Sequence, residues 1–281
     1  MPRSTDISPL SQLIRRIDSR SDGTRPTDTV PTGFPSVDQF LGGGMRCGDL
    51  VILGGDVSSG KSALALAVAL RAALVGVPVV FFTGEATTDR VLERMLALEG
   101  RARIDDLRRG SLDEATRASV GAAALRLRDV SPMVERLPSG IEALTEAIRS
   151  RGDLQLVIVD ALQTLTTGRA AQGEELAATV RALKGTAVDL GVALLLVTHL
   201  DARVRERSDR RPTLDDFGAL HAVKQHADIV FGLYREEMYQ GGLSVEGATE
   251  LLALKNRNGP TGYVDLYFYK QWMRFEDLME R

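Results

Sequence analysis

The sequence predicts an α/β fold with a central, mostly parallel β-sheet, flanking helices and an antiparallel C-terminal extension. Apolar runs that alternate with helical segments predict the parallel part, because such strands are covered on both faces. A glycine-rich loop joins the first run to a helix, as in many nucleotide-binding folds. The expected parallel strands are 50–54, 78–83, 155–160 and 193–199. The expected helices are 87–99, 112–128, 140–150 and 173–189. The expected antiparallel strands are 229–234, 250–254 and 263–269.

The first 31 residues are expected to lie outside this fold, which we expect to occupy residues 32–281. Residues 1–6 and 20–31 are rich in Ser, Thr, Asp, Pro and Arg, a composition typical of flexible segments. Between them, apolar side chains three and four residues apart predict a short amphipathic helix, formed around Ile7, Leu10, Ile14 and Ile17. Its apolar stripe has to pack on its own domain or on a neighbouring subunit.

The loop after the first strand reads Gly-Asp-Val-Ser-Ser-Gly-Lys-Ser over residues 55–62, the G-x-x-x-x-G-K-[ST] pattern of a P-loop. Backbone N–H groups of such a loop point at phosphate oxygens, and the following helix adds partial positive charge. The lysine reaches the β- and γ-phosphates, and the hydroxyl of Ser62 can ligate Mg²⁺. We therefore predict that a nucleoside triphosphate with Mg²⁺ binds at Gly55, Ser58, Ser59, Gly60, Lys61, Ser62 and Ala63.

Polar side chains stand where three predicted strands end, and parallel sheets place ligands at that edge. Asp160 follows four apolar residues, which favours a Walker B carboxylate beside Ser62, although Asp also caps helices. Glu85 could polarise an attacking water, or be a first-turn helix carboxylate. His199 could sense the γ-phosphate, or be an ordinary core histidine.

Two cations near the C-terminus alternate along a predicted strand. Lys255 and Arg257 flank Asn256 just before a turn, so their side chains point the same way. Such a pair could stabilise charge on a γ-phosphate, as an arginine finger does. The alternative is a solvated strand end, where cations contribute little.

Five arginines fall within residues 203–211, in the loop that follows His199. Together with Lys224, Arg203 and Arg207 could follow a phosphodiester backbone. A solvated loop is the alternative, because arginine greatly outnumbers lysine throughout this chain. No aromatic residue lies in the run to stack on bases.

Composition narrows the remaining classes of protein. The net charge is −3, so a nucleic-acid partner would have to bind a local basic surface. No signal peptide or membrane-length apolar stretch is present, which predicts a cytoplasmic protein without a membrane partner. The single cysteine, Cys47, excludes an internal disulfide, and the five-residue spacing of His221 and His226 does not favour a zinc site.

The ordered series of motifs resembles the motor domain of the DnaB-type replicative helicases, which belong to the RecA-like ATPases. The resemblance covers roughly residues 30–280, without the N-terminal helical domain of that family. One difference is the stretch Gly-Ala-Leu-His at 218–221, where the family commonly has Arg-Glu-Ser-Gly. The motifs that carry the resemblance are 32–38, the P-loop, Glu85, the stretch 160–163, the stretch 257–262 and the closing 274–276.

The resemblance implies a homo-hexameric ring that hydrolyses ATP between subunits and moves on single-stranded DNA during DNA replication. It implies that Glu85 is the catalytic glutamate and Gln163 the coupling glutamine, with His199 in place of a frequent glutamine. It also implies that Lys255 and Arg257 act on the ATP of the neighbouring subunit. The helix at 7–19 resembles the linker helix that docks on an adjacent subunit.

Two other classes of function compete with the helicase interpretation. One is a regulatory or assembly ATPase similar to the KaiC or RadA groups, which would switch its oligomeric state without unwinding DNA. The other is a non-catalytic binding module. The intact set of predicted catalytic residues argues against the second: Lys61, Ser62, Glu85, Asp160, Lys255 and Arg257.

Overall fold

A computed structural model describes residues 8–21, 28–166, 172–239 and 245–278. Its centre is a nine-stranded sheet in the order β11-β10-β9-β8-β3-β7-β6-β4-β5. The strands from β8 to β5 in this order run parallel to one another, whereas β9, β10 and β11 extend the sheet through antiparallel pairings. This arrangement confirms the predicted fold class. The expectation that 229–234 belongs to the antiparallel strands is wrong in part, because this strand, β8, pairs in parallel with β3 and antiparallel only with β9.

The central strands form where the sequence is continuously apolar. All six residues of β3 (Leu50–Gly55) are buried, as are all five of β4 (Val79–Thr83) and of β6 (Leu156–Asp160). Covering both faces of these strands removes apolar surface from water, at about 25 cal/mol for each Å². The other parallel strands are β7 (Ala193–His199), β8 (Ile229–Tyr234) and the half-exposed edge strand β5 (Met133–Arg136).

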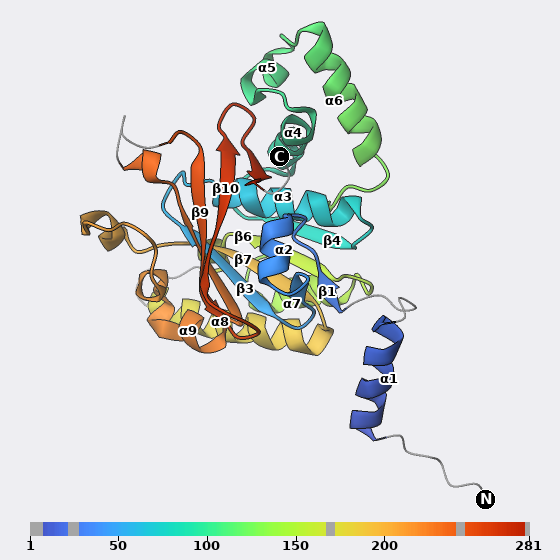
Figure 1. The fold of residues 1–281 in the computed structure, drawn as a ribbon, viewed down its shortest axis with the longest axis vertical. Helices are drawn as coiled ribbons and strands as arrows, with labels where there is room; N and C mark the ends of the chain where they lie inside the picture. The colour runs from blue at the N-terminus through green and yellow to red at the C-terminus, as the bar shows by residue number, and fades with distance from the viewer. Residues whose placement is uncertain (1–7, 22–27, 167–171, 240–244, 279–281) are drawn as a thin grey trace, which may run out of the picture.

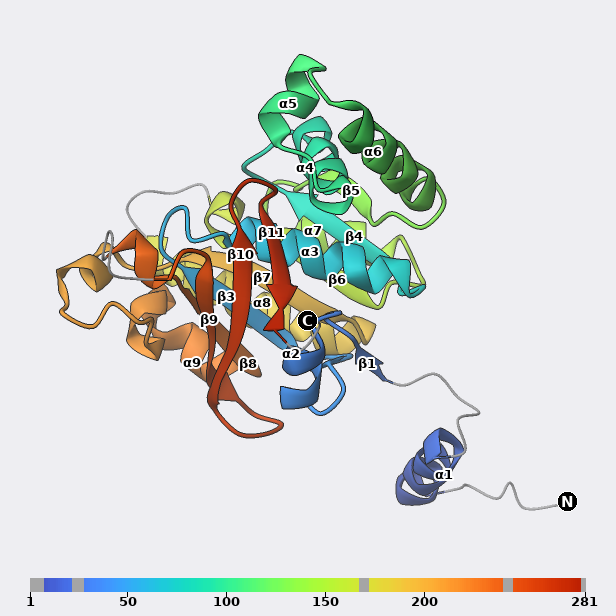
Figure 2. The ribbon, with the colours of Figure 1, turned by 45° about the horizontal axis from the view of Figure 1, so that its top comes forward.

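Helices cover the two faces of the sheet in separate layers (Figures 1 and 2). On one face α3 (Lys61–Leu74) and α4 (Thr88–Gly100) enclose a core with the side chains of Val51 and Leu53. On the other face a second core contains Leu50 and Ile52. The helices of that layer are α7 (Ile141–Arg149), α8 (Gln172–Leu190) and α9 (Ala222–His226).

The remaining elements are additions to this frame. Two helices, α5 (Ile104–Arg109) and α6 (Glu114–Leu127), pack on α4 at the top of Figure 1. The antiparallel extension consists of β9 (Ala248–Asn256), β10 (Gly262–Tyr269) and β11 (Arg274–Asp277). Short 3₁₀ turns span Leu162–Leu165, Ala202–Glu206, Leu214–Phe217, Ala219–His221 and Glu236–Met238.

The N-terminal prediction was right about the helix and wrong about part of the segment that follows it. Helix α1 spans Pro9–Ser21, and the predicted stripe residue Ile7 lies outside the described residues. Thr29–Val30 form strand β1, which pairs with β2 (Met45–Arg46), so this stretch is not flexible. The side chain of Val30 is fully buried, which ties β1 to the main core together with α2 (Pro35–Phe40).

Among the described residues, the apolar stripe of α1 is largely exposed. Leu10, Leu13, Ile14 and Ile17 are between 39% and 65% exposed. The described part of the chain therefore does not bury this stripe on its own domain. Among the described residues, no helix combines the length and the apolar character that crossing a bilayer requires.

Candidate active site

The P-loop connects the end of β3 to the start of α3, as the pattern predicts. Gly60 has φ +103°, in the left-handed region, where a side chain would be strained. A Cβ at Gly60 would also lie 2.9 Å from the ring of Phe275. Only glycine therefore lets the loop turn into α3 above the aromatic pair Phe268 and Phe275, whose centroids are 4.5 Å apart.

A cavity of about 550 Å³ opens beside this loop. Its lining joins the loop to three strand ends that are far apart in the sequence. Of the residues predicted to bind nucleotide, Gly55 and Ser59 do not line it; the Ser59 hydroxyl is buried without a hydrogen-bond partner among the described residues. The predicted residues that do line it are Ser58, Gly60, Lys61, Ser62, Ala63, Glu85, Asp160 and His199.

Burial sets the electrostatics of the two innermost charged groups. Lys61 and Asp160 are each 6% exposed. Burial lowers the pKa of Lys61, against the opposing charges of Asp160, Asp56 and Glu85. Burial raises the pKa of Asp160, against a hydrogen bond of 3.1 Å from the Ser62 hydroxyl. For each group, a bound ligand atom of the opposite charge would stabilise the charged form.

The donor set fits a nucleoside triphosphate with Mg²⁺. The hydroxyl of Ser62 and the carboxylate of Asp160 are neighbouring oxygen ligands of the kind that Mg²⁺ prefers. The N-terminus of α3 supplies N–H donors for phosphate oxygens. The ammonium group of Lys61 donates to the carbonyl of Asp56 at 2.8 Å, which keeps it inside the loop.

Glu85 and His199 contact each other at the mouth of the cavity. The Nε2 atom of His199 lies 2.9 Å from Oε1 of Glu85, and the Glu85 side chain is 43% exposed, so water can reach it. Gln163 lies behind this pair and does not line the cavity. Its Nε2 donates to the Thr198 hydroxyl at 2.9 Å, and its Oε1 accepts from the backbone N–H of His199 at 3.4 Å.

The sequence reasoning missed several residues of the cavity, among them Arg94 on α4, and Phe268, Lys270 and Met273 near the turn between β10 and β11. The side chain of Arg94 makes no hydrogen bond or ion pair with the described residues, and its charge lowers the pKa of Asp160 against the dominant effect of burial. No sequence pattern distinguishes it from the many other arginines.

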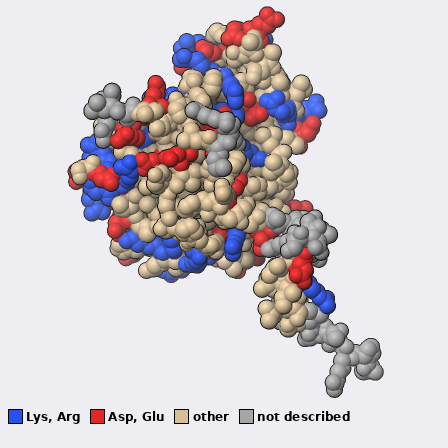
Figure 3. Space-filling view, in the orientation of Figure 1, with Lys and Arg blue, Asp and Glu red and all other residues tan. Residues whose placement is uncertain are grey.

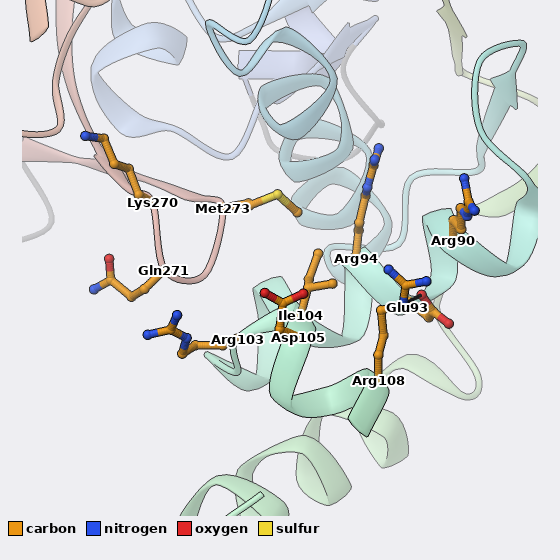
Figure 4. Close-up of a pocket in the computed structure, with 10 residues that line it drawn as sticks. All are labelled: Arg90, Glu93, Arg94, Arg103, Ile104, Asp105, Arg108, Lys270, Gln271 and Met273. Carbon is orange, nitrogen blue, oxygen red and sulfur yellow. Dashed lines mark ion pairs between the residues drawn. The ribbon is translucent and has the colours of Figure 1, made fainter. Parts of the chain in front are cut away.

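A second cavity of about 490 Å³ adjoins the first and shares Arg94, Lys270 and Met273 with it (Figure 4). Helix α4 also contributes Arg90 and Glu93 to this cavity, and further side chains come from α5 and from the turn after β10 (Figure 4). Cations predominate in its lining, so the positive surface extends beyond the phosphate-binding loop.

Lys255 and Arg257 lie near the N-terminal ends of the parallel strands, whereas the P-loop lies at their C-terminal ends. Lys255 pairs in register with Val230 of β8, near the start of the parallel strands. Its ammonium group donates to the carbonyls of Lys224 and Ala227 at 2.6 Å. The guanidinium group of Arg257 donates to Oδ1 of Asp228 at 3.0 Å, a carboxylate that also pairs with Lys184.

This placement separates the two cations from the P-loop of their own chain. β3 runs from Leu50, beside Asp228, to Gly55 at the P-loop. At about 3.3 Å per residue the two ends of β3 are roughly 17 Å apart, which is farther than a lysine or arginine side chain can reach. The structure brings Lys61, Ser62, Glu85, Asp160 and His199 together, and leaves Lys255 and Arg257 outside that cavity.

The three predicted DNA-contacting residues each pair with a carboxylate of this chain. Arg203 pairs with Asp201 at 2.8 Å, and Arg207 pairs with Asp216 at 2.9 Å. Lys224 pairs with Asp215. The hydrogen bonds from Arg203 lower the pKa of Asp201 to about 2, so that pair is fully charged at neutral pH. Figure 3 shows the blue side chains of the segment after β7 gathered at the left of the molecule.

Comparison with known proteins places this site in a family. The sequence profile described as the DnaB-like helicase C-terminal domain matches residues 29–277. The chain belongs to that family. Solved structures of similar proteins share its fold: one of them, an isolated ATPase domain, has a TM-score of 0.87 at 23% identity, and the match covers 97% of this chain and 100% of that domain.

Named DnaB-like relatives include the replicative DNA helicases DnaB of Leifsonia xyli and of Geobacillus stearothermophilus, 31% and 30% identical to this chain. The matches cover 89% and 90% of this chain but 56% and 57% of the relatives, so the chain spans little more than half of their length. A DnaB-like replicative helicase, solved in a study of its interactions with primase, has a TM-score of 0.85 at 22% identity, over 98% of this chain and 68% of its own.

Proposed function

We propose that this chain is the ATP-hydrolysing motor of a DnaB-type helicase, which acts in DNA replication as a homo-hexameric ring on single-stranded DNA. One observation carries the proposal: a single cavity of a DnaB-like domain holds Lys61, Ser62, Asp160 and Glu85. The family match favours this function over a regulatory ATPase of KaiC or RadA type. It also supports our expectation of a cytoplasmic location.

The residues of the cavity divide the chemistry among them. Lys61 leaves the carbonyl of Asp56 to bind the β- and γ-phosphates, which compensates for its burial. Ser62 and Asp160 would hold Mg²⁺, which would neutralise charge on the phosphates. Glu85 orients and deprotonates the attacking water, and its contact with His199 positions its carboxylate. Gln163 ties the 3₁₀ turn after β6 to the end of β7 through its hydrogen bonds with Thr198 and His199.

The site is completed by the next subunit. Lys255 and Arg257 cannot reach the P-loop of their own chain, but a neighbour in a ring could present them to it. They would stabilise the charge that develops on the γ-phosphate. The uncovered stripe of α1 supports such an assembly, because a helix on an adjacent subunit would bury it.

Single-stranded DNA is the proposed second ligand, with Arg203, Arg207 and Lys224 as its contacts. Each of these cations is held by a carboxylate, so a DNA phosphate has to replace Asp201, Asp216 or Asp215. Such an exchange weakens DNA binding relative to three free cations, and the phosphate contacts themselves make the binding dependent on salt.

ATP hydrolysis measured with and without oligo-dT tests the proposed function. We expect turnover that depends on Mg²⁺, rises with oligo-dT and disappears in Lys61→Ala, since the phosphates then lose their main cation. A matched control is Arg128→Ala, which removes an exposed ion pair with Asp129 at the end of α6. Undiminished turnover in Lys61→Ala, or turnover that oligo-dT leaves unchanged, would contradict the proposal.

A further inference from the structure

The arginine run after β7 is bound to the body of the domain rather than free in solvent. Val204, 2% exposed, anchors the segment in the core. Besides the pairs of Arg203 and Arg207, the guanidinium of Arg211 binds Glu250 at 2.6 Å, and that of Arg210 lies 5.2 Å from the ring centroid of Tyr239. The remaining arginine of the run, Arg205, reaches the P-loop.

Arg205 binds the carboxylate of Asp56, the second residue of the P-loop, through two nitrogens. Its Nε lies 2.9 Å from Oδ2 and its Nη2 lies 2.8 Å from Oδ1, which is a bidentate pair. The hydroxyl of Tyr239 donates to the same carboxylate at 3.1 Å, and the N–H of Val57 donates at 2.7 Å. The Asp56 side chain is only 13% exposed. Hydrogen bonds from three residues therefore hold the Asp56 side chain at the start of the P-loop.

These partners are themselves held in place. The ring of Tyr239 stacks on Tyr234 at the end of β8, with centroids 5.6 Å apart. Arg210 donates from Nε to the carbonyl of Arg205 at 3.3 Å. The 3₁₀ turn Ala202–Glu206 and the end of β8 thus form one support for Asp56.

The charge of Asp56 makes this support relevant to nucleotide binding. Burial tends to raise the pKa of its carboxyl, but the hydrogen bonds from Arg205, Val57 and Tyr239 outweigh burial and hold the pKa below its ordinary value. The group is therefore an anion at neutral pH. It lies in a loop built to bind a triphosphate, where an uncompensated negative charge repels the ligand. The carbonyl of the same residue accepts from Lys61.

We infer that Arg205 is a positioning residue for nucleotide binding, which neutralises Asp56 and holds the start of the P-loop in its binding geometry. The inference rests on the proposed binding of ATP at this loop. It assigns the arginine run a function at the phosphate site, in addition to any contact with DNA. If the ion pair between Arg205 and Asp56 were purely structural, the affinity for ATP would not depend on the charge of Asp56.

The Kd for a fluorescent ATP analogue, measured by titration in the presence of Mg²⁺, separates these possibilities. We expect Arg205→Ala to raise the Kd about tenfold, because it leaves an unpaired anion beside the phosphates. Asp56→Asn should bind at least as tightly as the wild type. The double variant should return to within about threefold of it, since the repulsion has been removed. The loss in Arg205→Ala should shrink as salt is added.

The controls keep the inference distinct from the proposed function. Arg149→Ala removes another exposed ion pair, with Glu146 on α7, and should leave the Kd unchanged. Should Arg205→Ala fail to fold, Arg205→Gln carries the same expectation with hydrogen-bond donors retained. No binding by the wild type would refute the proposed function. Binding by the wild type with an unchanged Kd in Arg205→Ala, or an equal loss in the double variant, would overturn the inference.

Discussion

Mixing two inactive variants tests whether the active site is shared between neighbouring chains. Glu85→Gln disables the P-loop side of an interface and keeps Lys255 and Arg257. Arg257→Ala does the reverse. Because roughly 17 Å of β3 separates the two halves within one chain, neither variant should repair itself. Losing an arginine finger costs about 10³–10⁵ in turnover, so each variant alone should be essentially inactive.

The mixture should recover activity by a predictable amount. In a random equal mixture, about one interface in four joins an intact P-loop side to an intact cation side, whatever the size of the ring. Steady-state ATP hydrolysis should therefore rise to about a quarter of the wild-type rate, or less if neighbouring sites act in concert. Binding of a fluorescent ATP analogue by Arg257→Ala should stay close to that of the wild type, since an arginine finger stabilises charge that develops only in the transition state.

The shared-site argument fails if the mixture stays inactive although native mass spectrometry shows mixed assemblies. It also fails if Arg257→Ala alone hydrolyses ATP at the wild-type rate. A mixture of Glu85→Gln with Lys61→Ala is the matched negative control, because both changes disable the same side of the interface.

Three further predictions concern the frame of the site. Glu237→Gln leaves the buried Arg235 without its carboxylate and should cost about 3 kcal/mol in urea unfolding at pH 7. Burial tends to raise the pKa of Glu237, but hydrogen bonds from Arg235, Lys270 and the Gly247 N–H hold the pKa below 4.5. The cost of Glu237→Gln in unfolding free energy should therefore decrease as the pH drops below 4.5. A cost that does not change with pH would be inconsistent with this reasoning. Gly60→Ala should abolish binding of a fluorescent ATP analogue, because both φ and Phe275 exclude a Cβ; binding of wild-type strength would contradict this. Phe275→Ala should cost about 3–5 kcal/mol in the same unfolding assay, since its ring is fully buried, and a loss below about 1 kcal/mol would show a looser core.

The strands and the P-loop could be predicted because their signals are local. Four buried strands read as continuous apolar runs, and the P-loop has a fixed spacing between a strand and a helix. Strand β5 was missed because it is half exposed at the edge and shows neither an apolar run nor alternation. Helix α5 is only six residues long, too short for helical periodicity to be recognised.

The rest of the site depends on tertiary contacts that a single sequence does not encode in any local pattern. Arg94 joins the cavity only because α4 packs beside the P-loop. The placement of Lys255 and Arg257 far from their own P-loop follows from the register between β8 and β9. The partners of Arg205 and Arg211 could not be predicted, because Asp56 and Glu250 are distant from them in sequence.

Electron microscopy of the protein with a non-hydrolysable ATP analogue, Mg²⁺ and oligo-dT tests the central claim most directly. We predict a closed ring in which each nucleotide lies between Lys61 of one subunit and Arg257 of the next, with the oligonucleotide in the channel. Nucleotide bound in separate monomers, with Arg257 still paired to Asp228, would contradict the account.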